Sequence, residues 1–415
     1  MNPGLYMIGK ITGFYFMFAV SVIAQNSDLL MKYHSGYYTA LGGTGYAAAK
    51  YASSLDLNPA VLSNYSSMQL SVSQSITYYD YGLVRISSTV GGQSFDWNKT
   101  LYNFEQASVV VPVNNKISIG AGLYRKINPQ LFNKKRAVTF SDLFTQETYG
   151  NVYSAAAALS YQLIKPLAFG ISVNKYFGTL NSKITGDNHG NDADKWASMK
   201  NDLSGVNFKC GLLLVDNDWS AGLIFETPFK MKVKTSNQIS LIELYKYLLP
   251  KYDETEWNQP MVVGAGVSYY GINSFLFEAD FEIRKYKSSN VQINLYEFGG
   301  SPVWQDIKIF RAGIQYKPDD WPLPIKIGYA YIPQLYYSNN SIGISNTISS
   351  YQNTDQNIKQ NYTAGTSVRL EKFSIDITIR YSVIKWKRTL LIPQKITDDF
   401  TEGDTVLSVG VAYSL

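Results

Sequence analysis

Long stretches of this chain alternate apolar and polar residues with a period of two, and no other feature of the sequence restricts the fold as much. This is the period of an extended strand with two unlike faces, not that of a helix. The stretches run to about ten residues or more, longer than typical soluble strands and close to the length of a tilted membrane-crossing strand. The clearest examples are residues 167–174, 275–284, 373–382 and 407–415.

The composition indicates which way the two faces of these strands point. Charged residues make up 17% of the 415-residue chain, below the roughly 25% of an average soluble domain, while hydrophobic residues make up 45% and aromatic residues 14%. In a soluble β-sandwich, the apolar faces would cover a shared core and the polar faces would meet water. Strand length and the aromatic surplus favour the opposite arrangement, with apolar side chains in lipid and polar side chains around a lumen.

The links between the alternating segments give the number of strands. Six short links alternate with seven long polar links, and together they separate fourteen strands. Outer-membrane barrels combine short periplasmic turns, longer outer loops and an even strand number. The sequence therefore predicts an all-β fold, a 14-stranded antiparallel transmembrane β-barrel over residues 68–415. Because the number of strands should be even, residues 80–89 are assigned to the first outer hairpin rather than to a further strand. The short links are 114–116, 164–166, 216–218, 270–273, 318–322 and 371–372, and the long links are about 79–100, 128–150, 181–203, 231–259, 287–305, 334–360 and 389–403.

Two segments precede the predicted barrel. Lys10 is followed by an apolar run of about 14 residues, too short to span a bilayer as a helix, so residues 1–24 are expected to form a cleaved signal peptide. Residues 25–67 then precede the first strand. Because fourteen strands enclose more space than their own side chains fill, we expect this segment to form a plug, or hatch, inside the lumen. The alternative is a periplasmic linker, which would be more polar.

The predicted hatch contains a pattern found in a known family. A glycine-rich stretch of small residues is followed by an Asn-Pro-Ala triplet, shortly before the first strand. The Gly-x-Gly spacing is a weak nucleotide-binding signal here, because no βαβ unit surrounds it. In order and position, the pattern resembles the hatch of the FadL-type long-chain fatty acid transporters. Its residues are Gly42, Gly43, Gly45, Asn58, Pro59 and Ala60.

The resemblance implies a fourteen-stranded barrel in the bacterial outer membrane, with an internal plug and outer loops that gather hydrophobic ligands. It also implies passive transport of hydrophobic compounds such as long-chain fatty acids. The expected partners are outer-membrane lipid and a hydrophobic small molecule. One branch that resembles the same family, the PorV-type proteins, instead holds exported proteins during type IX secretion. The hatch pattern fits both, so exported proteins remain open as alternative partners.

One long outer link contains a helical pattern. Apolar side chains recur there at the spacing of one helix face, and Pro250 would end the helix. Such a helix would either offer hydrophobic ligands an apolar landing site or pack on neighbouring loops as a cap, and both interpretations stay open. The residues of this face are Ile239, Ile242, Tyr245 and Leu249.

Alternate side chains of a strand face opposite sides, a relation we call strand parity. On the later strands it places charged side chains toward the lumen, because a charge facing lipid at mid-bilayer costs ~2–4 kcal/mol. The early strands carry small residues such as Gly120 and Gly170 instead. One interpretation is an internal ion-pair network that anchors the plug. The other is that an unpaired base receives a ligand carboxylate while the ligand tail lies along the small-residue wall. The acidic residues are Glu226, Glu278, Asp280, Glu282 and Asp376, and the candidate ligand-binding bases are Arg311, Lys326, Arg369 and Arg380.

Other classes of function find little support. The chain has one cysteine, Cys210, and two histidines, which excludes a disulfide framework and a cysteine-based zinc site and leaves no Ser-His-Asp arrangement. A net charge of +5 spread over the whole chain argues against nucleic-acid binding. Residues 187–194 are rich in oxygen ligands but lack the complete EF-hand spacing, which favours a solvated loop over a calcium site. We therefore expect no enzymatic activity, no metal and no cofactor.

Overall fold

The computed structural model describes most of the chain after residue 35. The described residues are 36–48, 50–81, 97–128, 131–136, 143–187, 195–239, 254–288, 302–319, 321, 323–344, 347–352, 358–391 and 395–415. The helical elements are α2 (Gly36–Ala40), η2 (Ala52–Asp56), η3 (Pro59–Asn64) and η5 (Tyr286–Ser288). The strands are β1 (Gln69–Tyr81), β2 (Trp97–Pro112), β3 (Ile117–Ile127), β4 (Leu131–Arg136), β5 (Leu143–Ile164), β6 (Leu167–Asp187), β7 (Lys195–Val215), β8 (Trp219–Glu226), β9 (Phe229–Ile239), β10 (Glu254–Gln259), β11 (Val262–Tyr269), β12 (Phe275–Arg284), β13 (Pro302–Trp304), β14 (Ile307–Tyr316), β15 (Ile325–Pro333), β16 (Tyr336–Ile344), β17 (Thr347–Gln352), β18 (Ile358–Leu370), β19 (Phe373–Leu391) and β20 (Lys395–Ser414).

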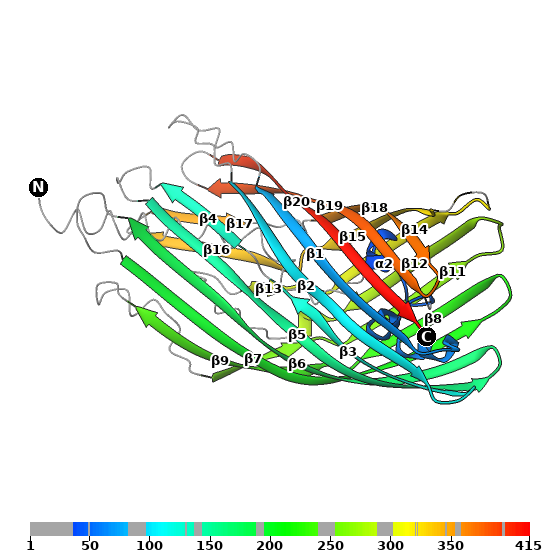
Figure 1. The fold of residues 1–415 in the computed structure, drawn as a ribbon. Coiled ribbons are helices and arrows are strands. Elements are labelled where there is room, and N and C mark those ends of the chain that lie inside the picture. The colour runs from blue at the N-terminus through cyan, green and yellow to red at the C-terminus, as the bar shows by residue number, and fades with distance from the viewer. Residues whose placement is uncertain are drawn as a thin grey trace, which may run out of the picture.

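These strands close into one antiparallel barrel (Figure 1). β1 pairs with β20 from Gln69↔Ser414 to Asp80↔Gly403, which joins the two ends of the sheet. Six barrel strands consist of two consecutive elements, namely β3/β4, β8/β9, β10/β11, β13/β14, β15/β16 and β17/β18. Fourteen strands therefore surround the lumen, and the predicted strand number is confirmed.

The strands extend further toward the outer loops than the sequence predicts. β5, β6 and β7 contain 22, 21 and 21 residues, so the predicted long links 128–150 and 181–203 are mostly strand. In this outer part the outward positions are polar, as at Lys200 and Asp202, while the inward Leu203 is buried. The alternation with an apolar outward face is lost there, which explains why the pattern indicates loops.

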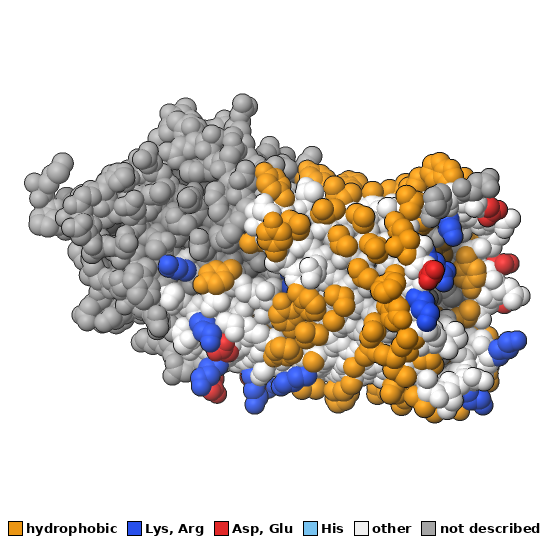
Figure 2. Space-filling view, viewed as in Figure 1, with side chains coloured by type: hydrophobic (Ala, Val, Ile, Leu, Met, Phe, Trp, Pro, Cys, Tyr) orange, Lys and Arg blue, Asp and Glu red, His pale blue; other side chains and the backbone are white. Residues whose placement is uncertain are grey.

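An apolar belt covers the barrel near the short turns (Figure 2). Its side chains point outward from successive strands, and Leu223, Val267 and Ile327 each expose more than half of their surface. In Figure 2, charged side chains lie on either side of the belt. On a closed barrel, an exposed apolar belt between charged zones is the surface that contacts acyl chains.

No helix within the described part of the chain has the length and apolar character needed to cross a membrane.

The segment before β1 lies inside the barrel, toward the end with the short turns (Figure 1). There α2 contacts β18, β19 and β20, η2 contacts β2 and β3, and η3 contacts β5, β6 and β7. Tyr38, Leu41, Tyr46 and Leu57 are buried together in this segment. The predicted signal peptide and the first residues of the predicted hatch lie outside the described residues and remain predictions.

Candidate functional site

Two glycines of the hatch pattern form a tight turn directly after α2. Gly42 and Gly43 have φ angles of 76° and 86°, in the left-handed region that residues with a side chain seldom adopt. A Cβ at Gly42 would also lie 2.5 Å from the carbonyl oxygen of Tyr329 on β15. The turn therefore brings the hatch backbone against the barrel wall, where the Gly42 N–H donates to Thr363 Oγ1 at 3.1 Å.

The Asn-Pro-Ala triplet forms the start of η3. Asn58 Oδ1 accepts from the Ala60 N–H at 3.0 Å, and Pro59 occupies the first helical position, where no N–H is needed. The amide nitrogen of Asn58 donates to the carbonyl oxygens of Tyr46 at 2.7 Å and of Leu212 on β7 at 3.1 Å. One fully buried side chain thus caps a helix, closes the hatch on itself and fastens it to the wall.

Wall glycines make room for the hatch backbone. A Cβ at Gly211 would lie 1.9 Å from Asn58 Oδ1, and a Cβ at Gly222 would lie 1.9 Å from the carbonyl oxygen of Tyr46. A Cβ at Gly170 would lie 2.3 Å from the backbone of η3. The hatch occupies the small-residue wall, which corrects the expectation that a ligand tail lies along it.

Three alternating carboxylates of β12 hold the part of the hatch between the two motifs. Glu278 accepts from Thr44 Oγ1 at 2.6 Å, and Asp280 accepts from the N–H groups of the next two residues at 2.8 and 3.2 Å. Glu282 accepts a short hydrogen bond from the Tyr46 hydroxyl. Strand parity places all three carboxylates in the lumen, and their burial confirms this prediction.

Tyrosine hydroxyls add hydrogen bonds within the hatch. Burial raises the pKa of the Tyr38 hydroxyl, which therefore stays protonated near neutral pH. It donates to the carbonyl oxygen of Ala48 at 3.3 Å and accepts from the Lys50 N–H at 2.9 Å. These side-chain hydrogen bonds thus satisfy two backbone groups of the hatch within the hatch itself.

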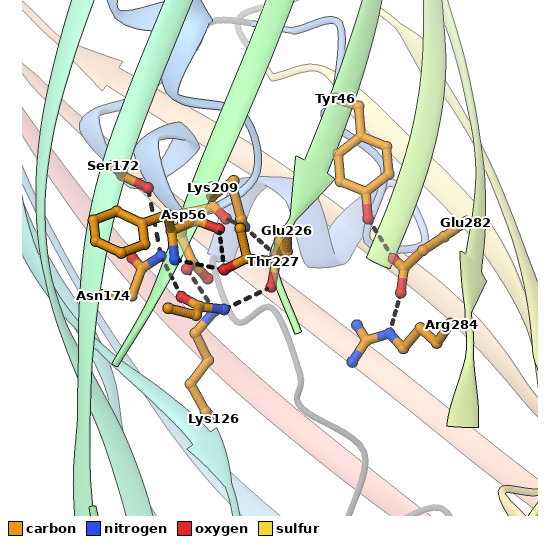
Figure 3. A network of polar contacts seen from close by, with 12 residues as sticks. Tyr46, Asp56, Lys126, Ser172, Asn174, Lys209, Glu226, Thr227, Glu282 and Arg284 are labelled. Atoms are coloured by element: carbon orange, nitrogen blue, oxygen red, sulfur yellow. Dashed lines mark hydrogen bonds and ion pairs between the residues drawn. The ribbon is translucent and has the colours of Figure 1, made fainter. Parts of the chain in front are cut away.

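Buried ion pairs tie η2 to β3 and β7 (Figure 3). Asp56 pairs with Lys126 at 2.5 Å, and its carbonyl oxygen accepts from Lys209. Lys209 also pairs with Glu226 at 2.6 Å. Removing one partner of a buried pair costs about 3–5 kcal/mol, because the remaining charge loses its compensation. These contacts favour the anchoring interpretation of the lumen charges.

Lys126 is a hatch contact missing from the predicted lumen charges, although it follows the inward parity of Ser118 and Gly120 on β3. Arg125 is the residue that departs from this parity. The register of β3 against β5 shifts between Arg125 and Ile127, so the neighbouring side chains of Arg125 and Lys126 are both buried. Arg125 forms an ion pair with Glu105. A bulge of this kind cannot be recognised from the alternation of apolar and polar residues alone. Lys209 follows the inward parity of β7, so the alternation was a usable signal for that residue.

The four candidate bases differ in their surroundings. Arg311 and Lys326 are buried and pair with carboxylates of β12 and β19 at 3.0 and 2.8 Å. Arg369 is exposed, close to the turn between β18 and β19. Arg380 lies 3.4 Å from Asp404, and its Nε is buried without a hydrogen-bond partner among the described residues. Among the four candidate bases, Arg380 thus keeps a buried donor without a partner in the described part of the chain.

On the outer-loop side of the hatch, the inner face of the barrel carries an apolar cluster, which we call the apolar compartment. Its aromatic members are stacked, with ring centroids 4.8 Å apart for Tyr176 and Phe229 and 5.9 Å apart for Tyr286 and Trp304. The Trp257 indole nitrogen is buried in this cluster without a hydrogen-bond partner in the described part of the chain. The buried residues of the apolar compartment are Ile127, Val152, Tyr176, Leu180, Leu203, Met231, Val233, Trp257, Tyr286, Ile307, Ile309 and Leu335.

The outside of the barrel is charged at the level of the apolar compartment. On β9, Lys230, Lys232 and Lys234 are exposed, while the intervening Met231 and Val233 are buried. This order is the reverse of the apolar belt, where the apolar side chains point outward. The alternation over 230–234 is visible in the sequence, but it falls in a predicted long link, so this apolar inner face is not predicted.

Two predicted outer-loop features fall largely outside the described residues. Ile239 is the last residue of β9, whereas Ile242, Tyr245 and Leu249 of the predicted helix are not described. Of the oxygen-rich segment 187–194, the structure describes Asp187 as the end of β6. Among the described residues, no group of three or more His, Cys, Asp or Glu side chains is arranged to hold a metal ion.

Solved structures share this fold. A FadL homologue from Pseudomonas aeruginosa has a TM-score of 0.63 at 12% identity, with 93% of this chain and 99% of that chain covered. The toluene transporter TbuX from Ralstonia pickettii has a TM-score of 0.58 at 12% identity, covering 92% and 99%. The toluene transporter TodX from P. putida has a TM-score of 0.59 at 14% identity, covering 93% and 99%. At these identities the likeness shows the fold, and it confirms the predicted resemblance to FadL-type barrels at that level.

A search of curated proteins gives no match to this sequence. The family model described as BamG matches residues 35–323, which is more than half of the chain and spans the hatch and the barrel through β14. Together with the closed barrel and its apolar belt, this match identifies a bacterial outer-membrane protein. The chain belongs to the BamG family, and its barrel and internal hatch have the FadL-type fold.

Proposed function

We propose that this barrel carries hydrophobic compounds passively across the outer membrane. The observation that supports the proposal most is the apolar compartment, which lines the lumen on the outer-loop side of the hatch. An inner wall that served only water and ions would be polar at this level, as it is at the level of the hatch. A hydrophobic solute that left water for this compartment would gain about 25 cal/mol per Å² of buried apolar surface.

The hatch bounds the apolar compartment on the side of the short turns. Glycine contacts, the Asn58 cap and buried ion pairs hold residues 36–64 against the wall on several sides. A solute that entered from the outer side would therefore stop above the hatch until a local rearrangement released it. In this proposal the lumen charges anchor the hatch and perform no chemistry, and the protein needs neither an enzyme site, nor a cofactor, nor a metal.

Long-chain fatty acids are our preferred ligands, with Arg380 as the residue that receives the carboxylate. Thr378, two residues before Arg380 on β19, donates to the carbonyl oxygen of Gly36 in α2 at 2.9 Å, so Arg380 lies on the outer-loop side of α2. A guanidinium donor and an apolar cluster inside the same barrel suit an amphiphile with one carboxylate. The solved toluene transporters with the same fold make neutral aromatic compounds the second ligand class to test.

Uptake into proteoliposomes tests the proposal, with a long-chain fatty acid and toluene as separate solutes. Met231→Asn places an amide in the apolar compartment, and Lys232→Asn makes the matched change on the outward face of the same strand. We expect Met231→Asn to lower uptake of at least one solute about tenfold or more, because a buried unpaired amide costs roughly 1–3 kcal/mol. Lys232→Asn should leave uptake unchanged. If the native barrel carries no solute faster than empty liposomes, the proposal is wrong.

The alternative function, holding exported proteins, rests on outer loops that lie outside the described residues. It predicts that exported proteins copurify with the barrel from whole cells and that Met231→Asn does not affect their recovery. Copurification without any solute uptake would favour this alternative over transport.

A further inference from the structure

Several neighbouring strands are interrupted at one level of the barrel wall. β8 and β9 are separated by residues 227–228, β10 and β11 by 260–261, and β13 and β14 by 305–306. Between them, β12 ends at Arg284 and the chain continues into η5. Pro228 and Pro260 lack the N–H that would continue the sheet, so two of these breaks follow directly from the sequence.

The breaks leave a hollow of about 680 Å³ in the wall. Pro228, Phe229, Pro260 and Met261 form its apolar part. Phe229 also packs against the apolar compartment, so it separates the hollow from the lumen. Lysine side chains surround the hollow, which gives it an apolar floor and a basic rim.

The hollow lies where the outward face changes from apolar to charged. Just below it, the outward Phe225 and Val263 are exposed members of the apolar belt. Just above it, β9 carries its row of outward lysines and β10 the exposed Glu254 and Glu256. On a membrane-crossing barrel, this boundary is the level of the lipid headgroups at the outer surface.

The charges around the hollow are mainly basic. Asp306 accepts from the Lys287 N–H at 3.0 Å and pairs with the Lys285 ammonium at 3.3 Å, so it holds both lysines at the rim. Lys230 is on the opposite side and pairs with Glu256 at 2.6 Å. Exposed pairs of this kind contribute only about 0–1 kcal/mol, so the ammonium groups can turn toward a stronger anion. The described outward residues nearby comprise six lysines against three carboxylates: Lys230, Lys232, Lys234, Lys285, Lys287 and Lys308 against Glu254, Glu256 and Asp306.

We propose that this hollow binds a phosphate-bearing lipid of the outer leaflet. The phosphate lies among Lys230, Lys285 and Lys287, and an acyl chain lies along the floor formed by Pro260 and Met261. A dianionic phosphate suits this rim better than a neutral headgroup because its charge is complementary to the surplus of lysines. The site is independent of the proposed transport, since it faces the membrane and not the lumen.

Native mass spectrometry of the purified full-length barrel tests the site, with lipid A that carries two phosphates as the probe. The test variant is Lys285→Gln/Lys287→Gln, and the control is Lys116→Gln/Lys165→Gln, which removes two exposed lysines from the short turns. We expect the test variant to bind the probe at least tenfold more weakly than the native barrel, and the control variant to bind it as the native barrel does.

Two further arms identify the ligand chemistry. Lipid A without its phosphates should bind as weakly to the native barrel as the phosphorylated lipid binds to the test variant. Inorganic phosphate should compete only at concentrations far above those of the lipid, because it lacks the acyl chain. Equal binding of phosphorylated and dephosphorylated lipid, or equal binding by the test and control variants, would overturn the proposal. Both variants should unfold at the native temperature, which separates a lost site from a lost fold.

Discussion

Gly211 of the barrel wall and Asn58 of the hatch fit together so closely that a Cβ at Gly211 would lie 1.9 Å from Asn58 Oδ1. That oxygen is the cap of η3, and the amide nitrogen of the same side chain donates to the wall at Leu212. The hatch is therefore seated by shape and by hydrogen bonds at one point.

Gly211→Ala should loosen the hatch without preventing barrel closure. The added methyl group must displace the Asn58 amide and its three hydrogen bonds, at an expected cost of about 3 kcal/mol or more. The cost should appear as a lower unfolding temperature and as faster proteolysis within residues 36–64. Gly403→Ala is the control, because its nearest neighbour would be a carbonyl oxygen at 3.3 Å. Equal protection of the hatch in both variants would contradict the close fit between Gly211 and Asn58.

Asn58→Asp should also destabilise the hatch, although the side-chain shape is unchanged. The carboxylate can still accept from the Ala60 N–H, but it cannot donate to Tyr46 and Leu212 and instead faces their carbonyl oxygens. We expect a loss of about 2–4 kcal/mol in the free energy of unfolding.

Asn114→Asp provides a matched comparison for that change. The Asn114 side chain in a short turn uses its oxygen to accept from two N–H groups, at 2.8 and 2.9 Å, and an aspartate keeps both bonds. Chemical denaturation should therefore show a large effect at residue 58 and almost none at residue 114. Similar effects at the two positions would mean that the amide donors of Asn58 contribute little.

The buried pair of Asp56 and Lys126 should behave as a unit. Lys126→Met leaves the Asp56 carboxylate buried without its ammonium partner, at a cost of about 3–5 kcal/mol. Asp56→Asn combined with Lys126→Met removes both charges and should recover most of the loss. A double-mutant cycle in thermal unfolding measures this coupling, and additive effects of the two substitutions would show that the pair does not anchor η2.

Arg380→Gln should separate charged from neutral ligands. If Arg380 receives a carboxylate, its loss removes a charged hydrogen bond worth roughly 1.5–3 kcal/mol, so fatty acid affinity should fall about tenfold or more. Toluene binding should stay unchanged. Arg369→Gln is the control, because Arg369 is exposed near a short turn. If both variants bind fatty acid as the native barrel does, the carboxylate lies elsewhere.

The sequence predicts the barrel well because every membrane-crossing strand needs apolar side chains on the face that contacts lipid. Alternation in segments such as 275–284 and 407–415 reports directly which side chains face acyl chains, and it fixes both the strand number and the lumen position of Glu278, Asp280 and Glu282. The hatch glycines and the Asn-Pro-Ala triplet are recognisable for a similar reason. A left-handed turn and a helix cap permit few residue types.

Other features depend on contacts that no local pattern contains. A register shift in β3 turns Arg125 inward next to Lys126, and parity alone cannot anticipate a bulge. The outer parts of β5, β6 and β7 lie beyond the apolar belt, so lipid no longer imposes apolar outward residues and their pattern indicates loops. The apolar compartment is assembled from many separate elements, and only the closed barrel brings its residues together.

Quenching of Trp257 by a brominated long-chain fatty acid tests the central claim most directly, because this indole lies within the apolar compartment. Bromine quenches tryptophan fluorescence only at short range, so a ligand in the lumen should quench the native barrel in a saturable way. Trp257→Phe should reduce the saturable component, of which Trp304 beside the same compartment supplies the remainder, and leave quenching of exposed tryptophans such as Trp219 and Trp321. A quenching curve that never saturates and is identical in the native barrel and the Trp257→Phe variant would contradict an apolar ligand site inside this barrel.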